Sequence, residues 1–326
     1  MTLARNICVC IDFLTQVHKE QIRKAAEETG FTPYFFTLNE LEEAKACVQD
    51  CEILYSHSPD LLRAAPATLQ WYACCFAGVD PYCKDESIFA NPACILTNAN
   101  VYGVTISEHV VMVLLMLLRR MPDYAKIVAA REWTNKLPIQ SIRGNTFTLL
   151  GTGNIGQTVA KRLRAMGAAR IVGISRSGSA VNGDFDEVLP VSRLDEILPE
   201  TYHLIMAMPG TAETAGILSR ERIARMPQGA CIVNVGRGSA VDQEALIEAL
   251  NNGKLGGAAL DVMMPEPLPA DHPLWTAKNV IITPHVSGNM SLEYTCDAAV
   301  DLFCEDLRRY AAGLPMENIV DRKLGY

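Results

Sequence analysis

The stretch Gly151-Thr-Gly-Asn-Ile-Gly156 follows directly on the apolar segment Thr146-Phe-Thr-Leu-Leu150 and precedes a helical pattern. A strand, a Gly-x-Gly-x-x-Gly turn and a helix in this order are typical of dinucleotide-binding folds. Gly151 then permits the tight turn, Gly153 lets backbone N–H groups approach a pyrophosphate, and Gly156 allows close packing of the helix on the sheet. The predicted cofactor loop consists of Gly151, Gly153, Asn154, Ile155 and Gly156.

Three polar residues follow later apolar runs of the same region. Arg237 comes after the run at 230–235, Glu266 comes a short distance after the run at 257–262, and His285 comes after the run at 280–283. Because the carboxyl ends of parallel strands share one edge of a sheet, we expect a cation, a carboxylate and an imidazole around one spot. Such a set suits reduction of a 2-oxo acid, in which a guanidinium grips oxygen atoms and an imidazolium, oriented by the carboxylate, donates a proton.

Each of the three residues also has an alternative interpretation when it is taken alone. His285 would be a structural histidine whose hydrogen bonds are formed within its loop, as any of the other five histidines would be. Glu266, between Pro265 and Pro267, would be a rigid surface residue, and Arg237 would hold a cofactor phosphate. Their combination at strand ends favours the catalytic interpretation.

Short apolar runs alternate with helical patterns along the whole chain, which indicates parallel sheets covered by helices on both faces. The first series of predicted strands is 7–11, 33–37, 53–55, 71–76 and 95–97. The second series has six members, at 146–150, 170–174, 202–207, 230–235, 257–262 and 280–283. A long amphipathic helix is predicted over 289–313, and we expect it to return to the first domain.

The predicted fold is therefore α/β, with two doubly wound parallel-sheet domains. Residues 1–100 plus 290–326 are expected to form a flavodoxin-like substrate (catalytic) domain, and residues 101–289 an inserted Rossmann domain that binds the dinucleotide. The hinges are expected near 98–103 and 286–289, with the ligand site in a cleft between the domains.

Composition limits the classes of partner. The chain has 326 residues and a formal net charge of −8, which argues against nucleic acid or an anionic membrane as the main partner. The longest purely apolar run, Val110 to Leu118, is far shorter than the roughly 20 residues that span a bilayer. The amino-terminal residues lack a signal-peptide core, and the 11 cysteines follow no metal-ligand spacing. We expect a cytoplasmic protein with reduced thiols and no metal.

The run Ser175-Arg176-Ser177 bears on the choice of cofactor. NAD enzymes usually place an acidic residue about 20 residues past the glycines, but here no carboxylate occurs before Asp184. Arg176 suits a 2′-phosphate, and both serines can donate hydrogen bonds to it, so NADP(H) is favoured over NAD(H). The alternative is that Arg176 is a solvated surface residue and that the serines tolerate NAD.

Taken together, these residues resemble the D-isomer-specific 2-hydroxyacid dehydrogenase family over nearly the whole chain. The blocks that carry the resemblance are 76–80, 102–109, 151–156, 233–238, 259–262, 265–267 and 283–288. The resemblance implies that Arg237 binds substrate, that His285 is the proton donor or acceptor and that Glu266 supports it. It also implies that backbone amides around Ala77, Gly78 and Val79 hold the substrate carboxylate.

Further cofactor contacts follow only from the resemblance. Asp261 resembles the residue that contacts the nicotinamide carboxamide, and Val235 and Gly236 would line the same pocket. Gly288 closes the block that carries His285, which itself lies beside the cofactor. The segment 119–137, with Trp133 as its aromatic anchor, resembles the arm through which family members form homodimers; by itself it would equally be a surface helix.

Two departures from the family pattern narrow the function. The Ser175-Arg176-Ser177 run resembles NADPH-preferring glyoxylate and hydroxypyruvate reductases. Ser56-His57-Ser58 stands where phosphoglycerate-oxidising members usually offer an arginine, and His57 would meet a phosphate only when protonated. The expected activity is therefore reduction of a small 2-oxo acid to a D-2-hydroxy acid. The alternatives are a short-form NAD-dependent D-3-phosphoglycerate dehydrogenase and a dinucleotide-sensing, corepressor-like binding protein.

Overall fold

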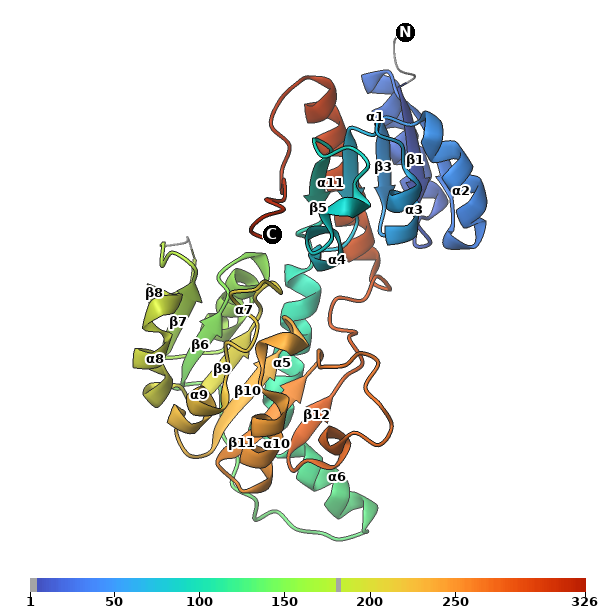
Figure 1. Cartoon of the computed structure of the whole chain (residues 1–326). Coiled ribbons are helices and arrows are strands. Elements are labelled where there is room, and N and C mark those ends of the chain that lie inside the picture. Colours follow the sequence, from blue (N-terminus) through green and yellow to red (C-terminus); the bar gives the residue numbers. More distant parts are fainter. Residues whose placement is uncertain (1–4, 180–182) are drawn as a thin grey trace. The chain divides into compact units, whose positions relative to one another are not determined.

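The computed structural model describes residues 5–179 and 183–326, and these form two compact units. Unit 1 contains the residues up to Tyr102 together with Met290–Tyr326, and unit 2 contains Gly103–Asn289. The chain thus leaves unit 1 once, builds the whole of unit 2 and returns (Figure 1).

Unit 1 is built on a five-stranded parallel sheet in the order β2-β1-β3-β4-β5. This is the flavodoxin-like order that the sequence predicts. Its strands are β1 (Asn6–Cys10), β2 (Thr32–Phe36), β3 (Ile53–Ser56), β4 (Trp71–Cys74) and β5 (Ile95–Asn98). Its α-helices are α1 (Gln16–Thr29), α2 (Leu41–Cys47), α3 (Pro59–Ala64), α4 (Asp80–Cys83) and α11 (Glu293–Ala311).

Each face of the unit 1 sheet has its own core. Along β1 the side chains alternate, so that Ile7 and Val9 join a cluster with α1 and α11, whereas Cys8 and Cys10 join a cluster with α2 and α3. The helix predicted over 289–313 is α11, which begins at Glu293 and packs on unit 1. Arg308 on this helix forms a 2.8 Å ion pair with Glu28 of α1.

Unit 2 is built on a seven-stranded parallel sheet in the order β12-β11-β10-β9-β6-β7-β8. Six of these strands follow the Rossmann order, with β12 added at one edge. The strands are β6 (Thr146–Leu150), β7 (Arg170–Ser175), β8 (Glu187–Pro190), β9 (His203–Met206), β10 (Ala230–Asn234), β11 (Leu255–Leu260) and β12 (Val280–Ile282). The α-helices are α5 (Gly103–Leu118), α6 (Met121–Ala129), α7 (Asn154–Ala165), α8 (Leu194–Ile197), α9 (Arg220–Arg225) and α10 (Gln243–Asn251).

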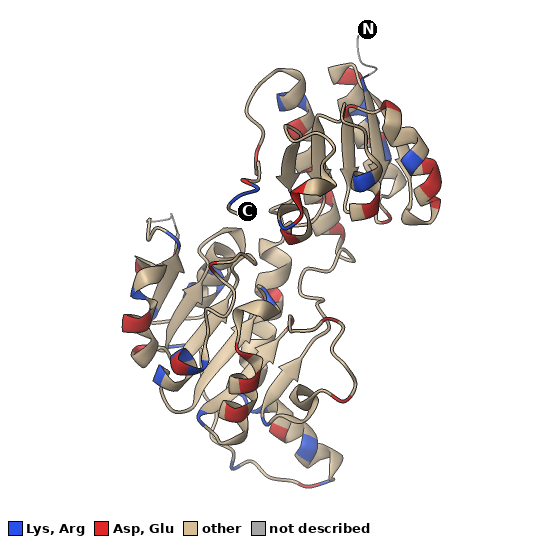
Figure 2. Cartoon of the chain, in the orientation of Figure 1, with Lys and Arg blue, Asp and Glu red and all other residues tan. Residues whose placement is uncertain are grey.

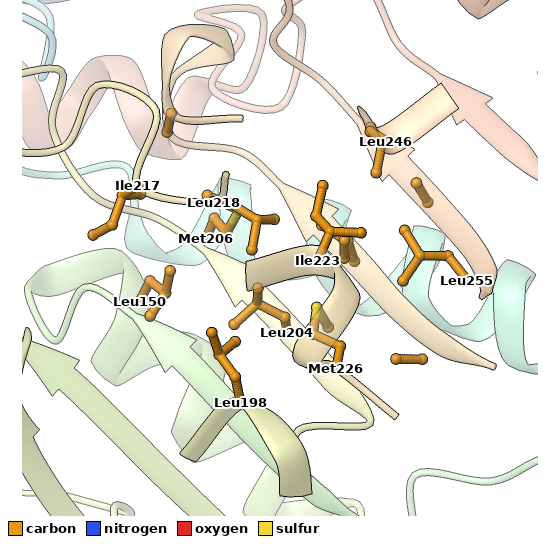
Figure 3. Packing of buried hydrophobic residues seen from close by; sticks show 14 of the residues in the cluster. Leu150, Leu198, Leu204, Met206, Ile217, Leu218, Ile223, Met226, Leu246 and Leu255 are labelled. Carbon is orange, nitrogen blue, oxygen red and sulfur yellow. The ribbon is translucent and has the colours of Figure 1, made fainter. Parts of the chain in front are cut away.

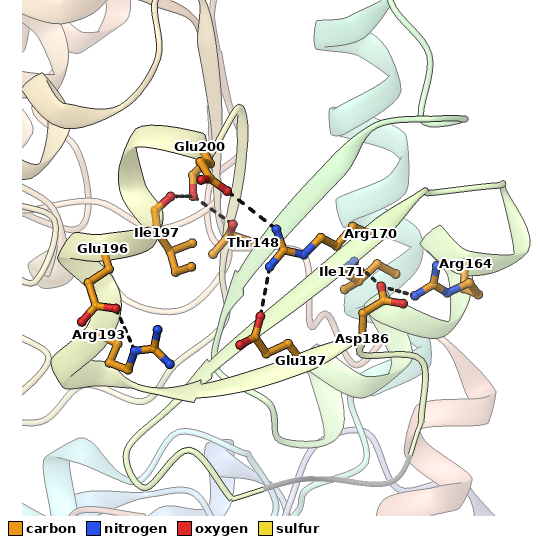
Figure 4. A network of polar contacts seen from close by, with 11 residues as sticks. Thr148, Arg164, Arg170, Ile171, Asp186, Glu187, Arg193, Glu196, Ile197 and Glu200 are labelled. Carbon is orange, nitrogen blue, oxygen red and sulfur yellow. Dashed lines mark hydrogen bonds and ion pairs between the residues drawn. The ribbon is translucent and has the colours of Figure 1, made fainter.

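The strand β8 corrects the prediction of six strands in this unit. It has four residues, starts with a charged side chain and ends at Pro190, so it lacks the apolar run typical of a central strand. As an edge strand it is held partly by charge: Glu187 pairs with Arg170 of β7 at 3.0 Å, and the preceding Asp186 pairs with Arg164 (Figure 4). The sequence pattern missed β8 because the charged Glu187 at its start is stabilised by Arg170 of β7, and a local pattern does not reveal that partner.

The main core of unit 2 lies on one face of its sheet. Leu204 and Met206 of β9 pack there with Ile223 of α9 and Leu246 of α10 (Figure 3). Charged residues lie mainly on helices and loops, whereas the strands are mostly free of them (Figure 2). Among the described residues, no helix is long and apolar enough to cross a membrane.

Candidate active site

The glycine loop connects β6 to α7 beside β9, where the strand order of the unit 2 sheet reverses. Gly151 has a φ of +103°, and a Cβ there would lie 2.7 Å from the carbonyl oxygen of Ala207. A Cβ on Gly156 would lie 2.1 Å from the carbonyl oxygen of Gly151. Both positions therefore exclude larger residues, because the backbone itself fills the space.

Gly153 differs from these two glycines. No atom lies within 4 Å of the place where its Cβ would stand, so packing within the protein does not require a glycine there. Gly153 is also the N-cap of α7, and no side chain caps that helix. Open space above exposed helical N–H groups fits a bound pyrophosphate, which a side chain at this position would obstruct. The loop thus fits a dinucleotide.

The run from Ser175 to Ser177 forms a compact turn at the carboxyl end of β7. The Ser175 hydroxyl accepts a 3.0 Å hydrogen bond from the N–H of Gly178, and the hydroxyls of Ser177 and Ser179 lie 2.8 Å apart. Arg176 and Ser177 are exposed at this turn. The turn therefore presents a cation and hydroxyl groups at the strand end next to the glycine loop.

Arg237 lies in a loop that the Asn234 side chain stabilises through two hydrogen bonds. Asn234 is buried at the end of β10; its side-chain oxygen accepts from the Gly236 N–H at 3.1 Å, and its amide donates to the Arg237 carbonyl at 2.9 Å. The guanidinium of Arg237 donates to the Gly236 carbonyl at 2.7 Å and is half-buried. Val235 is buried beside it. The sequence patterns did not single out Asn234 as a residue that positions Arg237. The feature that could have indicated it is a polar residue at the end of an otherwise apolar strand.

Glu266 and His285 are in direct contact. The Nδ1 of His285 lies 2.7 Å from one carboxylate oxygen of Glu266, and the other oxygen accepts from the Met263 N–H at 2.9 Å. A carboxylate at Nδ1 selects the tautomer with its proton there and leaves Nε2 for proton exchange with a ligand. The His285 side chain keeps 53% of its surface exposed, so Nε2 is within reach of a substrate.

The loop that carries His285 is fixed by Asp261, which is 1% exposed at the end of the β11 region. Its carboxylate accepts hydrogen bonds from Thr283, Val286 and Ser287 at 2.6–2.9 Å. Burial by itself raises the pKa of this carboxyl, but those hydrogen bonds outweigh it and hold the pKa below its usual value. The ionised Asp261 thus holds His285 in its left-handed conformation, with a φ of +55°. Its predicted contact with the nicotinamide stays a prediction.

His109 joins the same network from α5. Its Nε2 lies 3.2 Å from the Thr283 hydroxyl, which in turn donates to Asp261 at 2.6 Å. Because the Thr283 hydroxyl donates its proton to Asp261, it accepts from Nε2 of His109. Burial lowers the pKa of His109, against the opposing effect of Asp261, which favours the neutral imidazole. Among the six histidines, the sequence did not distinguish His109, because only the tertiary structure brings α5 to β12.

The predicted substrate loop lies in unit 1, after β4. The Ala77 carbonyl accepts a 2.7 Å hydrogen bond from the Asn98 side chain, and Val79 is the N-cap residue of α4. Among the described residues, the structure gives no hydrogen-bond acceptor for the N–H groups of Ala77, Gly78 and Val79. Consecutive N–H groups without acceptors suit a carboxylate.

His57 lies close to this loop, after β3. Its Nδ1 is 3.5 Å from the Cys75 sulfur, its ring centroid is 4.5 Å from that of Phe76, and its carbonyl accepts from the Tyr82 hydroxyl at 2.7 Å. Burial lowers the pKa of His57, with a smaller opposing effect from Asp12. The imidazole is therefore neutral near pH 7.

In unit 2, the predicted cofactor and catalytic residues all follow strand ends at the carboxyl edge of one sheet. An oriented imidazole with a free Nε2, a guanidinium and a dinucleotide cradle together provide the parts for hydride transfer coupled to proton transfer. Ala77, Gly78 and Val79 belong to unit 1, and their role in binding the substrate carboxylate stays a prediction.

Comparison with known proteins agrees with this chemistry. Residues 111–287 match the family model for the NAD-binding domain of D-isomer specific 2-hydroxyacid dehydrogenases. Glyoxylate/hydroxypyruvate reductase A of Klebsiella pneumoniae (strain 342) is 36% identical over 228 residues, which cover 69% of this chain and 70% of that protein.

Solved structures resemble the chain over nearly its full length. A D-isomer specific 2-hydroxyacid dehydrogenase family protein from Aeromonas salmonicida is 32% identical, with a TM-score of 0.82 over 98% of this chain and 99% of that one. The NADPH-dependent glyoxylate/hydroxypyruvate reductase of Sinorhizobium meliloti, in complex with NADP and sulfate, is 26% identical, with a TM-score of 0.82 over 99% of this chain and 100% of that one. The chain therefore belongs to the D-isomer-specific 2-hydroxyacid dehydrogenase family and is an oxidoreductase that acts on CH–OH groups.

Proposed function

We propose that this dehydrogenase uses NADPH to reduce a small 2-oxo acid of the glyoxylate or hydroxypyruvate type to its D-2-hydroxy acid. The observation that carries the proposal is the 2.7 Å contact between Glu266 and His285, at the same sheet edge as Arg237 and the glycine loop. The first unit then serves as the substrate domain and the second as the cofactor domain.

The chain's own residues divide the work of the reaction. The nicotinamide, when bound, supplies the hydride. Arg237 binds the carboxylate and the ketone oxygen of the substrate, and the N–H groups of Ala77, Gly78 and Val79 hold the carboxylate. Protonated His285 donates from Nε2 to the ketone oxygen as negative charge develops there. Glu266 stabilises the imidazolium and keeps its ring in place.

NADP(H) is proposed over NAD(H) because of the turn after β7. A 2′-phosphate carries more negative charge than a hydroxyl group and pairs with a guanidinium such as that of Arg176. Ser175 caps the turn through its hydrogen bond with Gly178, while exposed Ser177 offers a hydroxyl. The Sinorhizobium relative, whose structure contains NADP, supports the same choice.

A substrate without a phosphate group is proposed because of His57. Its pKa is lowered by burial, so at neutral pH it carries no charge with which to bind a phosphate. An uncharged imidazole beside the substrate loop suits a short substrate with a hydrogen or a hydroxymethyl group. This argues against the phosphoglycerate dehydrogenase alternative.

The test is the initial rate of cofactor oxidation by the purified protein, NADPH against NADH, with glyoxylate, hydroxypyruvate, pyruvate, phenylpyruvate and branched 2-oxo acids. We expect the highest kcat/KM with NADPH as the cofactor and either glyoxylate or hydroxypyruvate as the 2-oxo acid. Faster turnover with NADH would refute the cofactor proposal. Binding of both cofactors without any turnover would favour the corepressor-like alternative.

We also propose that the chain forms a homodimer through the segment 119–137 and the adjoining α5. A hollow of about 550 Å³ on unit 2 is lined by Met112, Leu115, Met116, Arg119, Met121, Tyr124 and Ile139. Within the segment 119–137, the Trp133 side chain is 99% exposed and Val128 is 70% exposed. A second copy would cover this apolar surface. Light scattering should give twice the mass of the chain, and the double variant Val128→Glu, Trp133→Ser should give the monomer.

A cytoplasmic location, which the sequence favours, stays a prediction that cell fractionation would test.

A further inference from the structure

Three cysteines of unit 1 gather beside α2, away from the substrate loop. Cys8 lies on β1, Cys47 is the last residue of α2, and Cys51 lies just before β3. Cys51 is therefore at the opposite end of β3 from Ser56 and His57. All 11 cysteines of the chain are free.

The sulfur atoms of Cys47 and Cys51 lie 3.8 Å apart. The backbone already brings them together, because α2 continues into the short 3₁₀ turn Val48–Asp50 and returns the chain at Cys51. The Cys51 sulfur also lies 3.2 Å from the Cys47 carbonyl oxygen. A disulfide needs sulfur atoms at about 2.05 Å, so the pair has to approach by less than about 2 Å.

The two thiols differ in exposure and in acidity. Cys51 is 1% exposed, whereas Cys47 is half-buried and open to small molecules. Hydrogen bonds from the Cys51 and Cys8 thiols lower the pKa of Cys47, and the hydrogen bond to Cys47, together with burial, raises the pKa of Cys51 and of Cys8. Because an oxidant has to reach the sulfur and reacts with the thiolate, Cys47, the most exposed of the three and the one whose pKa is lowered, is the residue of the cluster that reacts first.

We propose that hydrogen peroxide oxidises Cys47 and Cys51 to a disulfide. In this reaction Cys47 is the thiol that reacts with the peroxide and Cys51 is the resolving thiol. The Cys47 thiolate attacks one oxygen of hydrogen peroxide, which breaks the O–O bond and gives Cys47 sulfenic acid and hydroxide. The Cys51 sulfur then attacks the Cys47 sulfur, the S–S bond forms, and the sulfenic oxygen leaves as water after taking up a proton. Overall, two thiols lose two electrons and two protons, and one peroxide becomes two waters.

The consequence is that oxidation of Cys47 stays reversible. A sulfenic acid without a nearby thiol is oxidised further to sulfinic acid, which dithiothreitol does not reduce. With Cys51 3.8 Å away, the disulfide forms first and a reductant restores both thiols. This modification does not depend on the proposed substrate or cofactor.

The test treats the folded, full-length protein with hydrogen peroxide, removes the peroxide with catalase, alkylates free thiols with iodoacetamide and identifies tryptic peptides by mass spectrometry. Trypsin cleaves after Lys45 and Arg63, so both sulfurs lie in the single peptide 46–63. We expect most of this peptide to be two hydrogen masses lighter and without alkyl groups. Dithiothreitol before alkylation should restore two alkylated cysteines.

Two variants provide the contrast and the control. In Cys51→Ala, which buries no new polar group, Cys47 should be captured by dimedone as the sulfenic acid, and excess peroxide should make it unrecoverable by dithiothreitol. Cys83→Ser is the matched control: Cys83 is also half-buried, but among the described residues the structure gives it no sulfur–sulfur hydrogen bond. This variant should form the 46–63 disulfide as the unchanged protein does.

Three results would overturn the proposal. One is a peptide 46–63 that stays doubly alkylated at a peroxide dose that oxidises Cys83. Another is a disulfide that forms only in urea-unfolded protein. The third is a cross-link between peptide 46–63 and peptide 6–19, which carries Cys8 and Cys10. Such a cross-link, localised to one of those two cysteines by fragmentation, would assign the resolving role to it instead of to Cys51.

Discussion

The carboxyl edges of the two sheets differ in the groups that they present, although both sheets are parallel and doubly wound. The edge of unit 2 carries side-chain chemistry: the guanidinium of Arg237 and the imidazole of His285, which is paired with Glu266. The edge of unit 1 carries backbone N–H groups and the neutral His57. Under the proposed function, similar architecture thus provides the reacting groups in one unit and the loop that recognises the substrate carboxylate in the other.

The two histidines at these edges show the physical origin of the difference. His285 has a carboxylate 2.7 Å from Nδ1 and a half-exposed side chain, so its ring is oriented and Nε2 is accessible to a ligand. His57 has a thiol at 3.5 Å and is largely desolvated, which favours its neutral form. Under the proposed function, the carboxylate contact is what distinguishes the histidine that transfers a proton from the one that lies beside the substrate loop.

Replacement of His285 should have the largest effect. His285→Asn suits the φ of +55°, since asparagine tolerates the left-handed conformation, and therefore removes the imidazole with little change to the loop. We expect kcat to fall by about 10³-fold, while the dissociation constant of NADPH, from fluorescence titration, changes little. Turnover near that of the unchanged enzyme would remove His285 from the mechanism.

Replacement of Arg237 by lysine should have the second-largest effect on turnover. An ammonium group keeps the charge but not the planar two-point grip on a carboxylate and a ketone oxygen, so we expect kcat/KM for the 2-oxo acid to fall by about 10²-fold. Steady-state kinetics with saturating cofactor measures this. If the loss appeared in the KM for NADPH instead, Arg237 would be a phosphate ligand, as the alternative interpretation holds.

Arg176→Ala tests the cofactor turn and should have a smaller effect, confined to one cofactor. Loss of a charge-assisted contact with the 2′-phosphate should raise the KM for NADPH by about tenfold and leave the KM for NADH unchanged. The ratio of the two KM values is the readout, since a general loss of stability affects both cofactors. An unchanged ratio would contradict the assignment of Arg176.

His57→Gln should have the smallest effect on the chemical step. Because His57 is neutral and not paired with a carboxylate, we expect kcat to stay within about threefold of its original value, with changes mainly in the KM for the 2-oxo acid. Rate measurements across the substrate panel provide the check. A loss of kcat as large as that for His285→Asn would break the distinction between the two sheet edges.

Most of the sheet could be predicted from local patterns. Runs such as 146–150 and 170–174 correspond closely to β6 and β7, because buried parallel strands require continuous apolar residues. The short edge strand β8 was missed, since its charged first residue is stabilised by Arg170 of a neighbouring strand. Edge strands depend more on partners than on their own composition.

The sequence by itself determined the α/β class, the glycine loop and the candidate residues Arg237, Glu266 and His285, because spacing after strands places residues at one edge of a parallel sheet. Only the tertiary structure decided how they are held: Asn234 under the Arg237 loop, and Asp261 with His109 and Thr283 under the His285 loop. It likewise decided that Cys47 lies beside Cys51 and that His57 is neutral. Hydrogen-bond partners, sulfur distances and desolvation depend on how separate elements pack, and local sequence patterns carry little information about that.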